Sequence, residues 1–192
     1  MTERPAGKQP LPPHATKVFS GILFDVYHWE QELFDGSTRT FEKLKRHDSG
    51  FVIPVLPNGN LLITEDTQPG RDTVLTFPGG QIEPGEDAEV GVRRELLEET
   101  GYAPREMEFW KAENRYSKLD WAIFVFIARG LTKAAEPHPE AGERIVTKEI
   151  TFDEFIMLPD DPRFQNMEIT LDLVHARYDV EKKEALRKHI YG

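Results

Sequence analysis

The sequence of 192 residues contains no cysteine. Disulfides, thiolate metal sites and a cysteine nucleophile are therefore excluded, and we expect a cytoplasmic location. Long apolar runs are absent too, because the longest apolar-rich stretch, Trp121 to Ala128, is far shorter than the ~20 residues that span a bilayer. The N-terminus has no apolar core like that of a signal peptide. We therefore expect no membrane partner.

Positive charge is also scarce. Lys and Arg total 24 against 34 Asp and Glu, which gives a formal net charge of −10. This balance argues against nucleic acid or an anionic membrane as the main partner. A small-molecule substrate that carries phosphate would need a divalent cation and local arginines. The chain length suits one domain with its own core and a small appendage.

Three glutamates are concentrated within five residues of one predicted helix. Asp87 is a good N-cap, and Ala88 to Thr100 predict the helix. Glu95, Glu98 and Glu99 share one face, because positions i, i+3 and i+4 are neighbours on a helix. Like charges at this spacing repel, so a bound cation gives the cluster a physical reason to exist. Oxygen ligands favour Mg²⁺, Mn²⁺ or Ca²⁺ over zinc.

A glycine-rich turn precedes the helix. Pro78-Gly79-Gly80 and Pro84-Gly85 predict a tight loop whose backbone can approach a phosphate or a metal closely. The helix N-terminus would add amide donors and the positive end of a dipole. Gly80 is therefore a candidate substrate-binding position. We expect Arg94 to pair with Glu86 and so to fix the loop to the helix.

The spacing of these residues resembles the signature box of the Nudix hydrolases. The matching positions, in order, are Gly80, Glu86, Arg94-Glu95-Leu96, Glu98-Glu99 and Gly101, followed by Tyr102 where the family more often has an aliphatic residue. The box covers 23 residues. The resemblance implies hydrolysis of a diphosphate, and an α/β (α+β) fold in which a mixed β-sheet is sandwiched between helices.

The same resemblance implies roles for single residues. Glu95 and Glu99 would bind the main Mg²⁺ ions, or Mn²⁺, with Glu98 assisting and the backbone carbonyl of Gly79 completing the coordination shell. Glu98 is also a candidate catalytic residue, as are Arg94 and Glu86.

The general base varies within this family and often lies on a loop outside the box. Glu143 is the candidate here, because Ala141-Gly142-Glu143-Arg144 resembles the acidic position before the last strand of ADP-ribose pyrophosphatases. Glu140 is an equal competitor. The other interpretation is that Glu143 is simply a solvated loop residue.

The region before Phe51 resembles the N-terminal sheet of ADP-ribose pyrophosphatases, which exchanges between the subunits of a homodimer and helps to bind adenine. By this resemblance Trp29 and Phe41 would stack on the base, and Arg46 would contact phosphate or base. The alternative is that both aromatic side chains belong to the core. Gln68-Pro69-Gly70-Arg71 departs from the subgroup, so an arginine that faces the substrate there is displaced or missing.

We divide the chain into a flexible tail (1–16), an N-terminal antiparallel β subdomain (17–50) and a Nudix hydrolase domain (51–192). Two hairpins are predicted, one closed by Phe34-Asp35-Gly36-Ser37 and one by Pro57-Asn58-Gly59. The second would join strands at 51–56 and 60–65. Further strands are expected at 73–77, 107–115, 121–128 and 144–150, and helices at 166–177 and 181–189.

The resulting prediction is Mg²⁺-dependent hydrolysis of the diphosphate linkage in a nucleoside diphosphate derivative. ADP-ribose or a related nucleotide sugar is the first candidate, and ADP-ribose would give AMP and a sugar phosphate. Another diphosphate, such as a dinucleoside polyphosphate, NADH or a nucleoside triphosphate, is an alternative. A sensor that binds ADP-ribose without turnover is a third, against which the intact trio of Glu95, Glu98 and Glu99 argues.

Overall fold

The computed structural model describes residues 2–192. Two strands that are apolar on both faces form its centre, since β4 (Ser49–Pro54) pairs in parallel with β10 (Ile123–Lys133). Such strands are typical of a sheet that is covered on both sides. β7 (Gly79–Gln81) and β8 (Tyr102–Glu113) are their antiparallel neighbours, which gives the order β7-β4-β10-β8.

A second, three-stranded sheet lies beside the first. Its order is β11-β5-β6, and all its pairs are antiparallel. The strands are β5 (Leu61–Thr67), β6 (Val74–Thr76) and β11 (Arg144–Ile150).

The second predicted hairpin is wrong in its pairing. Both strands and the intervening turn exist, but β4 and β5 belong to different sheets and share only the bridge between Val55 and Leu61. Beyond that bridge β4 follows β10, and β5 follows β11 over its whole length. Partners distant in sequence thus replace the local partner.

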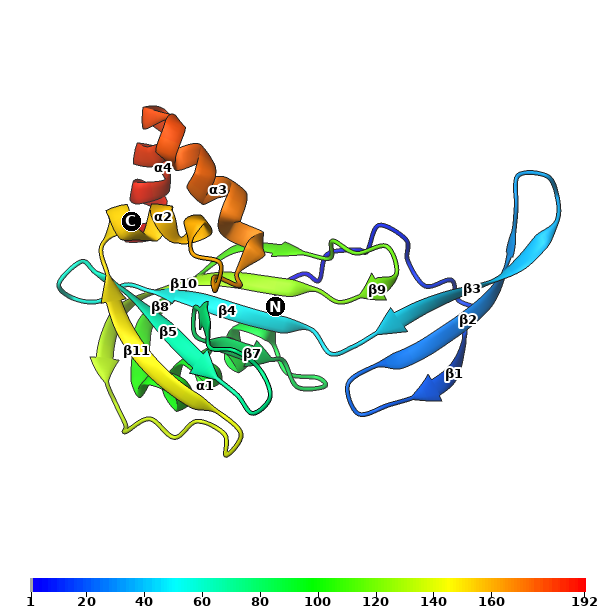
Figure 1. Ribbon diagram of the computed structural model, residues 1–192, viewed down its shortest axis with the longest axis horizontal. Helices are drawn as coiled ribbons and strands as arrows, with labels where there is room; N and C mark the ends of the chain where they lie inside the picture. The colour runs from blue at the N-terminus through cyan, green and yellow to red at the C-terminus, as the bar shows by residue number, and fades with distance from the viewer. Residues whose placement is uncertain (1) are drawn as a thin grey trace.

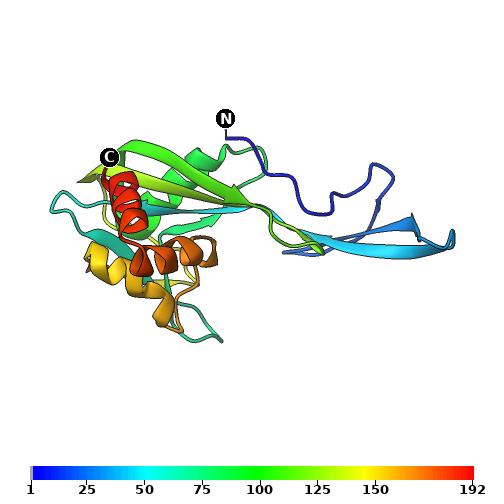
Figure 2. The same ribbon diagram turned by 90° about the horizontal axis from the view of Figure 1, so that it is seen from above.

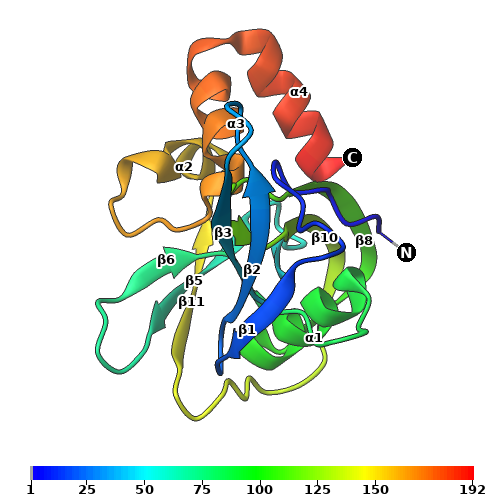
Figure 3. The same cartoon turned by 90° about the vertical axis from the view of Figure 1, so that its right-hand side faces the viewer.

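Helices cover both faces of this β core (Figures 1 and 3). α1 (Ala88–Thr100) lies on one face. The opposite face is covered by α2 (Phe152–Met157), the short 3-10 helix η1 (Leu158–Asp160), α3 (Met167–Tyr178) and α4 (Val180–Tyr191).

Alternation along β4 explains this sandwich. Phe51 and Ile53 pack in the cluster that contains Leu173 of α3, whereas Val52 packs in the cluster that contains Leu96 of α1. Successive side chains of a strand point to opposite faces, so an uninterrupted apolar strand needs a cover on each side. Full burial of one such leucine contributes about 1.5–3 kcal/mol.

A separate sheet forms an arm that projects from the core (Figures 1 and 2). Its order is β1-β2-β3-β9. The strands are β1 (Thr16–Ser20), β2 (Asp25–Glu32), β3 (Thr38–Lys45) and β9 (Leu119–Asp120). The last of these comes from the segment predicted as the Nudix domain, so the arm is completed by residues far along the chain.

The N-terminal tail has no helix or strand before Thr16. Met1 lies outside the described residues. Arg4 donates to Asp48 with Nε at 2.6 Å from Oδ2, and to Asp120 with Nη2 at 2.9 Å from Oδ1, so this part of the tail contacts the body of the protein. The flexibility expected for residues 1–16 stays a prediction.

Local signals mark both ends of α1 and the start of α2. The Asp87 side chain accepts from the amide of Glu89, and Gly101 ends α1 with φ of 70°. α2 was missed, although Thr151 and Glu154 form a capping box that marks its start. Within residues 2–192 no helix is both long and apolar enough to cross a membrane.

Candidate active site

The loop before α1 passes directly over a helix carboxylate. A Cβ added to Gly80 would lie 2.6 Å from Oε1 of Glu95, which is closer than real Cβ contacts come. The absence of a side chain therefore lets the β7 backbone reach the acidic face of α1, as the sequence predicted for a glycine in this loop.

Arg94 ties this loop to the helix. Its Nη1 lies 2.8 Å from Oε1 of Glu95 and 3.3 Å from Oε2 of Glu98. Its Nη2 lies 3.2 Å from Oε2 of Glu86 and 3.2 Å from the carbonyl oxygen of Gln81. The hydrogen bond from Arg94 to Glu86 holds the pKa of Glu86 below its usual value. The expected Arg94–Glu86 pair is thus present. The same guanidinium also bonds to the helix, so it joins the loop of the box to α1.

Glu99 is the most deeply buried of the three helix glutamates, with an exposed fraction of 7%. Burial raises the pKa of its carboxyl to about 9, and the nearby charges of Glu95 and Glu143 add to the effect. A hydrogen bond with the backbone of Gly79 opposes it. Burial also raises the pKa of Glu95. A carboxylate in this position needs either a proton or a cation.

The structure separates Glu143 from its competitor Glu140. Glu143 is half-buried at the start of β11 and accepts a hydrogen bond from Gln68, with Nε2 at 2.8 Å from Oε1. Burial raises the pKa of Glu143, and the charges of Asp66 and Glu140 reinforce the shift. Glu140 itself is exposed. The charge of Glu143 also contributes to the raised pKa of Glu99.

Sequence reasoning missed Asp66 at this site. It expected the arginine of the Gln68–Arg71 segment to be displaced or missing, and the structure places Arg71 beside Asp66. Asp66 lies close enough to Glu99 to raise its pKa, and its Oδ1 is buried without a hydrogen-bond partner among the described residues. Arg71 pairs with Asp66, and Gln68 donates to Asp66 with Nε2 at 3.2 Å from Oδ2. The sequence signal was the alternation of side chains along β5. Asp66 lies on the same face of this strand as Leu62, which packs in the cluster on the α1 side.

The predicted base platform lies on the arm. Trp29 has an exposed fraction of 4%, and its ring meets that of Phe41 edge-on at a centroid distance of 5.8 Å. The two residues are paired on β2 and β3, and these strands project away from α1 (Figures 1 and 2). The guanidinium of Arg46 instead lies over the ring of Trp121, 4.6 Å from its centroid. The roles expected for Trp29 and Phe41 stay predictions.

Comparison with known families agrees with this geometry. Residues 45–171 match the family described as NUDIX domain. The chain belongs to the NUDIX family. The family and fold expected from the signature box are therefore confirmed, and the Nudix match includes the whole of α1 and Glu143.

Several curated proteins resemble this Nudix chain. It is 28% identical over 181 residues to the ADP-ribose pyrophosphatase of Bacillus subtilis (strain 168), which covers 89% of this chain and 87% of that protein. It is 27% identical over 176 residues to the methanol dehydrogenase activator of Bacillus methanolicus, which covers 89% and 92%. It is 27% identical over 124 residues to the ADP compounds hydrolase NudE of Escherichia coli (strain K12), with 63% of each chain covered.

One solved structure resembles this Nudix fold over nearly its whole length. The crystal structure of an ADP compounds hydrolase matches with a TM-score of 0.72 and 21% identity, over 93% of this chain and 98% of that chain. At this identity the likeness concerns the fold.

The Nudix carboxylates fit a hard divalent cation. Within residues 2–192 no three acidic or histidine side chains are already arranged as a metal site. Glu95 and Glu98 are instead hydrogen-bonded to Arg94. None of the cationic side chains in residues 2–192 forms an ion pair with the buried Glu99, and Gly80 leaves space beside Glu95 that a Cβ would fill. The atoms that could coordinate a cation here are carboxylate and carbonyl oxygens, which are the ligands that Mg²⁺ and Mn²⁺ prefer.

Proposed function

We propose that this protein hydrolyses the diphosphate linkage of a nucleoside diphosphate derivative, with ADP-ribose or a related nucleotide sugar as the first candidate. The observation that carries the proposal is the buried carboxylate of Glu99 beside Glu95 and Gly80, in a Nudix box. Relatives named for ADP-ribose and for ADP compounds support this substrate class. With ADP-ribose the products would be AMP and a sugar phosphate.

Glu95, Glu99 and the carbonyl oxygen of Gly79 would hold Mg²⁺ or Mn²⁺, with Glu98 assisting. A divalent cation in this place supplies positive charge that neutralises the phosphate oxygens of a diphosphate. Arg94 keeps Glu86 and the box loop in position against α1. The protein's contribution is therefore a fixed acidic pocket whose loop backbone can reach a phosphate group.

Glu143 is our candidate for the base that takes the proton from the attacking water. Gln68 fixes its carboxylate by donating a hydrogen bond, and burial raises its pKa toward the working range of a general base. The contribution of its charge to the raised pKa of Glu99 supports a base close to the proposed metal ligands. Glu140 lacks this burial and this partner.

We also propose a homodimer that uses the arm. Single exposed apolar residues are normal on protein surfaces, but here several gather on one small sheet and its turns. The exposed side chains are Val18, Phe19, Ile22, Leu23 and Phe34. A small sheet needs a covered apolar face to be stable, and a second copy of the arm would supply that cover. Light scattering that gives the mass of a monomer would remove the dimer from the proposal.

The deciding experiment is hydrolysis of a diphosphate panel with Mg²⁺, with Mn²⁺ or with EDTA. The panel holds ADP-ribose, other nucleotide sugars, NADH, diadenosine polyphosphates and nucleoside triphosphates. We expect turnover that depends on the cation and is highest for ADP-ribose or a nucleotide sugar. We expect Glu99→Gln to lose turnover by orders of magnitude while it stays folded.

Other outcomes have distinct meanings. Cation-dependent cleavage of another panel member would keep the roles of Glu95 and Glu99 but change the substrate class. Binding of ADP-ribose without any turnover would favour the sensor. Wild-type rates in Glu99→Gln would remove Glu99 from the metal site.

A further inference from the structure

A second cavity borders the two glycines that approach the metal pocket. It has a volume of about 330 Å³ and is lined by Gly79 and Gly80 on one side. Tyr116 and Trp121, which flank β9, line it as well, together with Glu168 in the first turn of α3. A cavity of this size is within the range that binds small molecules. A ligand there would touch the same loop as the diphosphate.

The aromatic pair in this cavity is arranged as a stacking surface. The rings of Tyr116 and Trp121 are nearly parallel, with an angle of 8° between their planes and 6.1 Å between their centroids. The indole is held in place because Trp121 Nε1 donates to Oγ of Ser49 at 3.1 Å. Tyr116 remains 44% exposed. Planar bases stack on such surfaces with little dependence on their sequence or identity.

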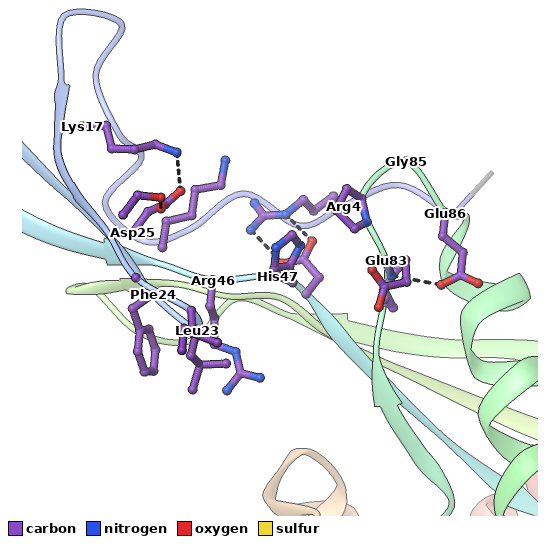
Figure 4. A pocket seen from close by; sticks show the side chains of 17 residues that line it. Arg4, Lys17, Leu23, Phe24, Asp25, Arg46, His47, Glu83, Gly85 and Glu86 are labelled. Atoms are coloured by element: carbon purple, nitrogen blue, oxygen red, sulfur yellow. Dashed lines mark hydrogen bonds and ion pairs between the residues drawn. The ribbon is translucent and has the colours of Figure 1, made fainter. Parts of the chain in front are cut away.

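Arg46 packs on the Trp121 ring but lines a different cavity, together with Arg4 and His47. Its guanidinium lies over Trp121, and none of the acidic side chains in residues 2–192 forms an ion pair with it. Its Nε is buried without a partner. Arg4, by contrast, pairs with Asp48. Figure 4 shows the Arg46 guanidinium pointing to the opposite side of the chain from Arg4 and His47.

The polar wall of the cavity offers an acceptor. Glu168 has an exposed fraction of 8%; its own backbone N–H donates to its carboxylate, but no other side chain in the described part of the chain does. Burying a carboxylate without such partners is costly, so a ligand that donates N–H groups would be favoured here. The exocyclic amino group of a purine is such a donor. Glu168 therefore complements the aromatic pair.

We propose that this cavity is the nucleobase subsite of the hydrolase, in which an amino-bearing purine stacks on Tyr116 and Trp121 and donates to Glu168. Arg46, whose guanidinium lies over the Trp121 ring, is a positioning residue for that indole. This inference rests on the proposed function, because it assigns the nucleoside half of that substrate. It moves the base from Trp29 and Phe41 on the arm to a cavity of the Nudix core.

The test is calorimetric binding of AMP, GMP and ribose 5-phosphate in EDTA, where no turnover occurs. Loss of one stacking contact of about 1–3 kcal/mol corresponds to roughly tenfold or weaker binding. We expect Trp121→Leu and Tyr116→Leu to weaken AMP and GMP binding about tenfold or more, and to leave ribose 5-phosphate binding unchanged. Tyr178→Leu, which removes another exposed aromatic residue, should bind AMP like the wild type.

Each result decides the assignment. Wild-type AMP affinity in both Tyr116→Leu and Trp121→Leu would overturn it, as would a wild-type protein that binds neither nucleotide. Weaker AMP binding in Trp29→Leu, with Trp121→Leu unaffected, would return the base to the arm. Should Trp121→Leu not fold, Tyr116→Leu decides, because that side chain is partly exposed and its loss costs less stability.

Failure of the subsite can be told from failure of the hydrolase. An unchanged KM for ADP-ribose in Trp121→Leu and Tyr116→Leu would reject the subsite and leave hydrolysis intact. AMP binding that depends on Trp121, in a wild-type protein without turnover of any diphosphate, would retain the subsite and reject the hydrolase.

Discussion

Replacing Glu99 by glutamine is expected to stabilise the metal-free protein. Burial, aided by Glu95 and Glu143, raises the pKa of Glu99 from 4.5 to about 9. Between these values the folded protein retains a proton that the unfolded chain releases. The free energy of unfolding therefore falls as pH rises from about 4.5 to about 9. Glutamine has no proton to lose, so the variant escapes this penalty.

The size of the effect follows from the same pKa. At about pH 7.5 the penalty spans about three pH units, which at about 1.4 kcal/mol each sets an upper limit of about 4 kcal/mol. Relaxation and water entry around buried charges reduce such limits, so we expect a gain of about 1–2 kcal/mol. For a chain of this length that raises the melting temperature by about 2–8 °C. Near pH 4.5 the gain should vanish, because Glu99 is protonated in the folded state.

Thermal melts in EDTA at several pH values measure this difference. Mg²⁺ should stabilise the wild type and leave Glu99→Gln unchanged, because binding favours the folded state only where the site is intact. Glu89→Gln is the matched control, since Glu89 lies on the same helix and pairs with Arg93. A Glu99→Gln protein that melts below the wild type at pH 7.5, or whose difference does not vary with pH, would refute the reasoning.

Three further predictions concern the base, the loop and the core. Glu143→Gln should lower kcat about 10²-fold or more with little change in melting temperature, while Glu140→Gln keeps the wild-type rate; equal rates in a steady-state assay would remove Glu143 from the mechanism. Arg94→Lys should lose the hydrogen bonds that join the loop to the helix. We expect the free energy of unfolding, measured by urea titration, to fall by about 1–2 kcal/mol. Leu96→Ala should lose about 2–5 kcal/mol by the same measurement, and a smaller loss would mean that the site collapses around the cavity.

The helix of the Nudix box could be predicted because its signals are local. Asp87 caps it and Gly101 ends it at the expected positions. The Arg94–Glu86 pair follows from the same segment. A 3-10 helix and α2 were missed, but the capping box of Thr151 shows that the signal for α2 was present.

Pairing between strands was predicted less well. The turn at Gly59 is local and formed as expected, with φ of 85°. The partners of its flanking strands are not local, since β4 lies beside β10 and β5 lies beside β11. Apolar alternation reveals which face of a strand is buried, but it does not select one apolar partner over another.

The sequence alone determined the family, the bounds of α1 and the acidic face that Glu95, Glu98 and Glu99 share, because spacing along one helix is a local property. Only the tertiary structure decided that Glu99 is buried, that the charge of Glu143 raises its pKa, and that Arg46 stacks on Trp121. These relations join segments far apart in the chain. They depend on strand pairing and packing, which fix distances that no local pattern encodes.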